Sequence, residues 1–119
     1  MPWRVELHPR FRLEVRELPQ EVRRALGRTL VAVEIEGPDL GRPYVDTLRG
    51  SRHANMKELR VVAGGGAWRF AFAFDPLRRA VVLIGGDKRG VDQRQFYEGL
   101  IRLADRRFDD YLNGEGGHS

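Results

Sequence analysis

Cysteine is absent from this chain of 119 residues, and histidine occurs only three times. The absence of cysteine excludes disulfides, thiolate zinc sites and thiol nucleophiles, and the histidines are too scattered to form a metal site. We therefore expect no metal and no cofactor. The chain also lacks an apolar run long enough to span a bilayer, and its first residues lack the basic-then-apolar pattern of a secretory signal. These absences predict a cytoplasmic protein without membrane contact.

Length and charge place further limits on the protein. A chain of this size supports one hydrophobic core, which predicts a single domain over residues 1–112 and a disordered, glycine-rich tail over 113–119. The net charge is only +4, but residues 42–89 carry ten Lys or Arg against four acidic residues. Such a basic centre favours a polyanionic partner, because phosphate contacts supply most sequence-independent affinity for nucleic acid. An ordinary solvated surface explains the charge equally well.

The pattern of apolar residues predicts an α+β fold. Alternation over residues 3–7 indicates a strand, and apolar residues at helical spacing over 9–18 and 20–36 indicate two helices that form an N-terminal α-hairpin. Leu18-Pro19 marks the break between these helices. Residues 37–55 are dense in glycine and proline and are predicted to form a long loop.

The second half of the chain predicts three strands and a C-terminal helix. The strand candidates are residues 56–62, 68–74 and 80–84. Short turns connect them, which indicates an antiparallel meander, and Gly85-Gly86 is expected to end the third strand. Asp92 is placed to cap the closing helix, in which Phe96 begins a series of apolar residues at helical spacing.

The strand at residues 68–74 has two contrasting faces. Aromatic residues form the face expected in the core, and they are Trp68, Phe70, Phe72 and Phe74. On the other face Arg69 stands beside Ala71 and Ala73, whose small side chains predict a shallow basic cradle open to a ligand. Arg60 lies across a hairpin from Arg69, so the two guanidinium groups are placed to converge on one phosphate. Alternatively, each arginine pairs with a carboxylate such as Glu58 or Asp75.

Other candidates for chemistry are few. Lys57 and Lys88 are the only lysines, and a lysine among arginines gives up its proton more readily than an isolated one, which suits proton transfer. His53, in the long loop, is a candidate acid, base or RNA contact, and the alternative is a solvent-exposed loop histidine. For Tyr97, a packing role is favoured over stacking or proton transfer.

Short motifs follow one another in a characteristic order along the chain. They are Leu40-Gly41-Arg42-Pro43, Leu48-Arg49-Gly50, Lys57-Glu58-Leu59-Arg60, Trp68-Arg69-Phe70-Ala71-Phe72-Ala73-Phe74-Asp75 and Gly86-Asp87-Lys88-Arg89-Gly90. This series covers nearly the whole chain except the tail. It resembles the HigB-like branch of the RelE/ParE toxins of type II toxin-antitoxin systems, including the phage-derived host-killing relatives of that branch.

The resemblance implies a small twisted antiparallel sheet with helices packed on one face. It also implies a ribosome-dependent endoribonuclease that cuts mRNA without a metal, by attack of the ribose 2′-hydroxyl, and a helix-turn-helix antitoxin as the partner. Arg60 and Arg69 would then hold the scissile phosphate, and Lys57 or Lys88 would assist charge or proton movement. The remaining basic side chains predicted to contact RNA are Arg49, Arg52, His53 and Arg89.

Two other functions are compatible with the same residues. ParE-like relatives share the fold but inhibit DNA gyrase without cutting RNA. A non-catalytic module that binds nucleic acid or protein through its basic face is the third possibility. Some family members use histidines or a late tyrosine for proton transfer, and the sequence leaves the general acid and base unassigned.

Overall fold

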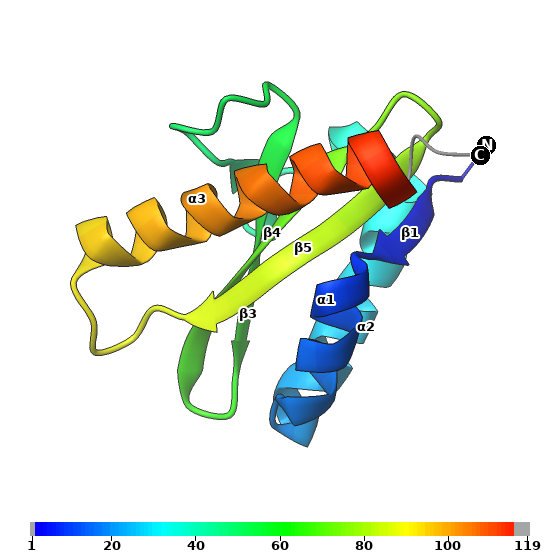
Figure 1. Cartoon of the computed structure of the whole chain (residues 1–119). Helices are drawn as coiled ribbons and strands as arrows, with labels where there is room; N and C mark the ends of the chain where they lie inside the picture. The colour runs from blue at the N-terminus through cyan, green and yellow to red at the C-terminus, as the bar shows by residue number, and fades with distance from the viewer. Residues whose placement is uncertain (1, 116–119) are drawn as a thin grey trace.

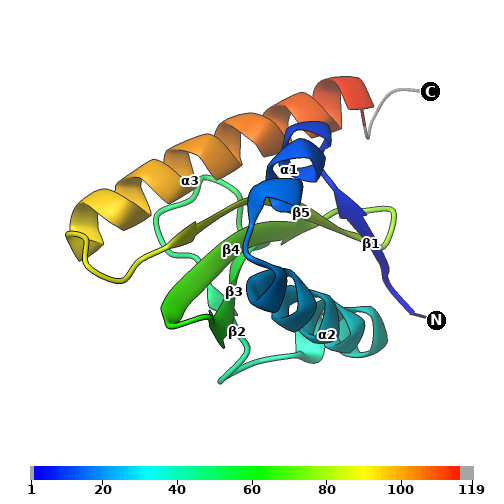
Figure 2. The same ribbon diagram turned by 90° about the horizontal axis from the view of Figure 1, so that it is seen from below.

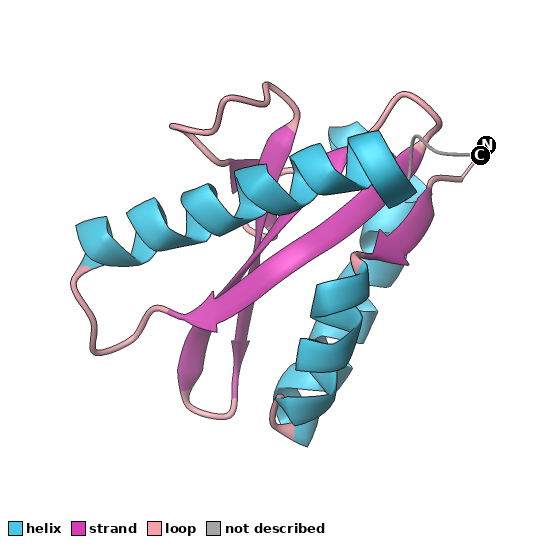
Figure 3. Ribbon diagram, in the orientation of Figure 1, coloured by secondary structure: helices cyan, strands magenta, loops and turns pink. Residues whose placement is uncertain are grey.

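The computed structural model describes residues 2–115, in which one sheet is flanked by helices (Figure 1). In chain order the elements are β1 (Arg4–Leu7), α1 (Pro9–Glu14), the 3-10 turn η1 (Val15–Glu17), α2 (Gln20–Glu36), the 3-10 turn η2 (Gly37–Asp39), β2 (Val45–Thr47), β3 (Met56–Ala63), β4 (Gly66–Phe74), β5 (Arg79–Asp87), α3 (Gln93–Asp110) and the π-helical turn η3 (Tyr111–Glu115). The predicted α+β class is confirmed (Figure 3). None of the helices in the described part of the chain is long and apolar enough to cross a membrane.

The five strands lie in the order β1-β5-β4-β3-β2. Strands β3, β4 and β5 form the predicted antiparallel meander, and the short β2, inside the predicted loop 37–55, pairs antiparallel with β3. Strand β1 runs parallel to β5, with Val5 opposite Ala80, so the expectation of an all-antiparallel sheet is wrong. Parallel neighbours need a long connection, which here consists of everything between β1 and β5, and a strand of four residues carries no local signal of its direction.

Helices cover both faces of the sheet, which corrects the expectation that they pack on one face. Figure 2 shows the strands between α3 on one side and α2 on the other. The aromatic face of β4 belongs to the core beneath α2, as predicted, with Phe70 fully buried against Phe11 of α1. On the opposite face Ala71 and Ala73 are fully buried in a cluster with Ala104 of α3. The alanines therefore serve close helix packing and do not form an open cradle.

Strand β5 continues through Gly85-Gly86 to Asp87, so the prediction that these glycines end the strand is wrong. The glycine at position 85 meets a packing requirement. A Cβ atom placed there would lie 2.2 Å from Cδ1 of Phe70, which is closer than any real contact. The absent side chain thus lets the Phe70 ring lie over β5, and the strand carries the chain on toward Lys88.

The three α-helices agree closely with the helices predicted from the sequence. The chain reverses direction between α1 and α2, as the predicted hairpin requires (Figure 1). Asp92 caps α3 as expected, because its side chain accepts a hydrogen bond of 2.9 Å from the backbone N–H of Gln95. Helix α3 ends in η3, and the part of the predicted tail over residues 116–119 lies outside the described residues.

Candidate functional site

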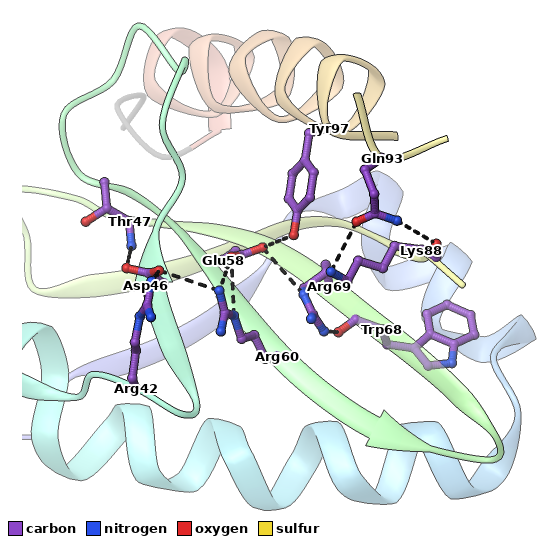
Figure 4. Close-up of polar contacts among 10 residues, drawn as sticks. All are labelled: Arg42, Asp46, Thr47, Glu58, Arg60, Trp68, Arg69, Lys88, Gln93 and Tyr97. Carbon is purple, nitrogen blue, oxygen red and sulfur yellow. Dashed lines mark hydrogen bonds and ion pairs between the residues drawn. The ribbon is translucent and has the colours of Figure 1, made fainter. Parts of the chain in front are cut away.

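Arg60 of β3 and Arg69 of β4 lie directly opposite each other in the antiparallel register (Figure 4). Both side chains lie on the face of the sheet that α3 covers. Along their strands they alternate with residues such as Leu59 and Phe70, which belong to the core on the opposite face, beneath α2. The strand alternation and the hairpin between β3 and β4 therefore bring the two predicted arginines together. Together they form the centre of a network of polar side chains on this face.

Glu58 lies between the two arginines. One carboxylate oxygen is 3.2 Å from Nη2 of Arg60, and the other is 3.7 Å from Nε of Arg69. Glu58 is only 5% exposed. Of the two arrangements that the sequence left open, the free protein therefore has the arginines paired with a carboxylate. The other carboxylate considered, Asp75, pairs instead with Arg79.

Arg69 is the most buried basic group of the network, with 9% of its surface exposed. Its Nη1 donates a hydrogen bond of 3.0 Å to the backbone carbonyl of Trp68. Its Nε is buried and has no hydrogen-bond partner within the described residues. A buried donor without an acceptor is costly, so this nitrogen is suited to donate a hydrogen bond to an anionic ligand.

Tyr97 of α3 completes the network from above the sheet. Its hydroxyl donates a hydrogen bond of 2.8 Å to Glu58. Burial of the phenol, together with the negative charge of Glu58, raises the pKa of Tyr97. The hydroxyl therefore keeps its proton at neutral pH and can donate it. The ring packs against the core beneath α3, as the sequence favoured, and its polar end points toward Glu58 and Arg69 (Figure 4).

Lys88 reaches the same site from the segment between β5 and α3. Its Nζ lies 3.2 Å from the side-chain oxygen of Gln93, and 5.9 Å from the centre of the Tyr97 ring. Gln93 also donates a hydrogen bond of 3.2 Å to the backbone carbonyl of Lys88, so it holds the lysine at two points. Sequence reasoning did not identify Gln93, because its role depends on where the first turn of α3 begins.

Lys57, in contrast, is placed on the other side of the sheet. Successive side chains of a strand point to opposite faces of the sheet. Lys57 therefore lies on the same face as Leu59, which belongs to the core beneath α2, whereas Glu58 and Arg60 face α3. Its Nζ lies 3.3 Å from the hydroxyl of Thr47 on β2. The structure therefore brings together Arg60, Arg69 and Lys88 among the predicted catalytic residues and separates Lys57 from them.

An additional acidic group borders the network on the side of β2. Asp46 lies 3.5 Å from Arg60 and 2.7 Å from Arg42. The hydrogen bond from Arg42 lowers the pKa of Asp46, as does the backbone N–H of Thr47. Arg60 is thus held between two carboxylates, and its side chain is 30% exposed, whereas that of Arg69 is 11% exposed.

The predicted RNA contacts lie outside this centre. Arg52 and His53 are held against the second half of α3, where Arg52 contacts Asp109 and Nε2 of His53 lies 2.8 Å from the same carboxylate. The hydrogen bond from Arg52 is the main reason that the pKa of Asp109 is lowered, and the same contact raises the pKa of Arg52. Arg49 is exposed beside them. Arg89 is distant from this loop and lies against Gly65 at the β3–β4 hairpin tip.

Metal ligands do not cluster in the described part of the chain, where no group of three or more His, Cys, Asp or Glu side chains is placed to hold an ion. The site instead offers positive charge, a protonated phenol and a buried carboxylate within one network. Such a group can bind a phosphate and move a proton.

The fold defines a class of protein, the small α+β domains that share the RelE fold. The free-state structure of an Escherichia coli RelE toxin, in a form with two arginine-to-alanine substitutions, superposes with a TM-score of 0.62 over 86% of this chain and 96% of the other, at 18% identity. That likeness concerns the fold.

Sequence comparison defines the family more narrowly. The model of the family described as Phage derived protein Gp49-like (DUF891) matches residues 13–109, and the chain belongs to this family. Two candidate toxins of Mycobacterium tuberculosis are similar to it. HigB3 is 47% identical over 85 residues, which cover 71% of this chain and 72% of HigB3. HigB2 is 45% identical over 96 residues, which cover 80% of this chain but only 47% of HigB2. The resemblance to HigB-like toxins is thus confirmed.

Proposed function

We propose that this protein is the toxin of a toxin-antitoxin pair and that it cuts mRNA on the ribosome. Its membership of the Gp49-like family, its similarity to the HigB candidates and its RelE fold support the role of a toxin. The observation that carries the choice of RNA cleavage is the buried Arg69, whose Nε lacks a hydrogen-bond partner in the described part of the chain beside Arg60 and a protonated Tyr97. A phosphodiester that displaces Glu58 from this position would bring acceptor oxygens within hydrogen-bond distance of Arg69.

The proposed reaction needs no protein nucleophile. The ribose 2′-oxygen attacks the adjacent phosphorus, a 2′-O–P bond forms, and the bond from phosphorus to the 5′-oxygen of the next nucleotide breaks. The products are a 2′,3′-cyclic phosphate and a 5′-hydroxyl end. Arg60 and Arg69 stabilise the negative charge that grows on the phosphate oxygens, and Lys88 adds a third positive charge at the edge of the site.

Two protons must move in this reaction, and Tyr97 with Glu58 can carry them. We assign Glu58 to accept the proton of the 2′-hydroxyl once the phosphate has taken its place on the arginines. Tyr97 then donates a proton to the leaving 5′-oxygen, since its raised pKa keeps the phenol protonated at neutral pH. The sequence left both roles unassigned.

We also propose the partners and the location that this activity requires. A toxin of this kind needs an antitoxin, for which the family resemblance favours a helix-turn-helix protein, and its substrate is mRNA held in the ribosome. Both place the protein in the cytoplasm, and we assign the activity to a single domain over residues 1–112. Lys57, on the opposite face, is proposed to contact RNA outside the cleavage site.

Induced expression in bacteria with mapping of transcript ends tests the proposal. Wild type should stop growth and produce new 5′-hydroxyl ends inside translated messages, whereas Arg69→Ala and Tyr97→Phe should lose both effects by about 100-fold or more. Arg12→Ala, at an exposed arginine of α1, is the matched control and should remain toxic. Thermal melting of each purified variant separates loss of chemistry from loss of folding. Growth arrest with intact transcripts would contradict RNA cleavage and favour gyrase inhibition, which a supercoiling assay detects.

A further inference from the structure

A groove runs from the candidate active site along the first half of α3. It has a volume of about 650 Å³ and lies between α3 and the loop that follows β2. Tyr97 and Gln93 line its inner end, and both also belong to the network around Glu58 and Arg69. The groove is therefore continuous with the place where a scissile phosphate would bind, and its volume is within the range of small-molecule sites.

The outer wall of the groove is a loop held rigidly in place. Asp105 of α3 is buried and accepts hydrogen bonds from the Ser51 hydroxyl and, at 3.2 Å, from the backbone N–H of Arg52. His53 packs edge-on against Phe108, with 4.9 Å between ring centres. These contacts fix the loop along α3 before any ligand arrives, so the groove exists in the free protein.

The floor and rim of the groove differ in chemistry. Ile101 and the Tyr97 ring provide an apolar floor, and the Gly50 backbone comes so close that a Cβ there would lie 3.4 Å from Cδ1 of Ile101. Arg49 and Arg102 stand exposed on the rim, and neither forms an ion pair within residues 2–115. The two other arginines of the rim are already paired with carboxylates, Arg52 with Asp109 and Arg94 with Glu98. An apolar floor with free guanidinium groups at the rim fits a base and its phosphates.

We propose that this groove binds the nucleotides of single-stranded RNA that adjoin the cleaved bond. A base rests on Tyr97 and Ile101, and the neighbouring phosphates bind Arg49 and Arg102. An acidic segment of a protein partner is the other occupant that the charge would suit, but continuity with the phosphate site favours RNA. This inference rests on the proposed function, because it assigns a subsite to the same reaction.

The test compares a double charge reversal, Arg49→Glu with Arg102→Glu, with the matched reversal Arg12→Glu with Arg16→Glu on the distant α1 and η1. The probe is a short, fluorescently labelled single-stranded RNA with 2′-O-methyl groups at every ribose, which cannot be cleaved. The groove reversal should weaken binding by about tenfold or more, and it should reduce the slope of log affinity against log salt by about 1.4, or 0.7 for each lost phosphate contact. The α1 reversal should change neither quantity.

Cleavage of messages on programmed ribosomes provides the second measurement. The groove reversal should raise the toxin concentration needed for half-maximal cleavage while the saturating rate stays near that of wild type, because the arginines of the reaction centre are untouched. Arg49→Lys with Arg102→Lys should restore most of the RNA binding, and equal melting temperatures confirm that each variant is folded.

The outcomes separate this inference from the proposed function. If wild type cuts messages and the groove reversal binds and cuts RNA equally well, the inference is overturned and the function stands. If wild type binds RNA through the groove but cuts nothing, the function falls and the assignment of the groove as a subsite of the reaction falls with it, leaving only a groove that binds single-stranded RNA. If the groove reversal cuts normally but escapes neutralisation by its antitoxin, the groove binds protein and the inference is overturned.

Discussion

Replacing Glu58 by glutamine removes the one negative charge between Arg60 and Arg69 while keeping an oxygen that Tyr97 can hydrogen-bond. Breaking a buried ion pair costs about 3–5 kcal/mol of folding stability, because the remaining charge is left uncompensated. Only Arg69 is deeply buried, and the Arg60 side chain, at 30% exposure, is screened by solvent. We therefore expect a loss of about 2–3 kcal/mol.

For a chain of this length that loss corresponds to a fall in melting temperature of roughly 6–15 °C. Glu98→Gln is the matched control, because Glu98 pairs with Arg94 on the surface, and it should change the melting temperature by less than about 2 °C. Calorimetry or circular dichroism at neutral pH measures both variants. The reasoning is refuted if Glu58→Gln melts within about a degree of wild type.

The same substitution should improve phosphate binding. Without the carboxylate, the competing anion between the two guanidinium groups is gone, although Arg60 keeps its contact with Asp46, so inorganic phosphate should stabilise Glu58→Gln more than it stabilises wild type. At phosphate about tenfold above its Kd, the gain is about 1.4 kcal/mol, or roughly 4–7 °C. Equal phosphate stabilisation of both proteins would show that Glu58 does not occupy the anion position.

Burial, with a hydrogen bond to Glu6, raises the pKa of Tyr111 to about 12, so the stability it contributes is present below pH 10 and lost between about pH 10 and 12. Urea unfolding across this range should show a decline of about 2 kcal/mol that Tyr111→Phe removes, and parallel profiles for the two proteins would contradict this. Gly85→Ala should destabilise the protein by about 1–3 kcal/mol because a methyl group there collides with Phe70. Gly27→Ala, in the middle of α2 with nothing within 4 Å, should raise stability by about 0.5–1 kcal/mol, and denaturant titration of both alanine variants checks the opposite signs.

The structural features that depend on only a few adjacent residues were predictable from the sequence. Alternation along residues 68–74 identified β4 and its core face, and Asp92 identified the start of α3, because both signals depend on backbone geometry over a few residues. The approach of Arg60 to Arg69 was predictable for the same reason, since a tight hairpin fixes the register of the two strands that it joins.

Features that depend on packing between distant segments were not predictable. The two alanines of β4 indicated an open cradle, because nothing local shows that α3 returns to cover them. The hydrogen bond between Tyr97 and Glu58 joins residues 39 positions apart, so the role of the phenol depends on the angle at which α3 crosses the sheet. Lys57 was grouped with Arg60 because they are close in sequence, although they lie on opposite faces of β3.

The sequence by itself thus determined the class of fold and the pair of arginines, because local periodicity and short-range register are encoded in adjacent residues. The family followed from the order of its short motifs, which resemble those of HigB-like toxins. Only the tertiary structure decided that β1 runs parallel to β5, that helices cover both faces, that Glu58 and Tyr97 join those arginines in one network, and that Lys88 lies beside the Tyr97 ring. Those arrangements arise from the burial of whole faces of helices and strands, and no short stretch of sequence specifies which faces meet.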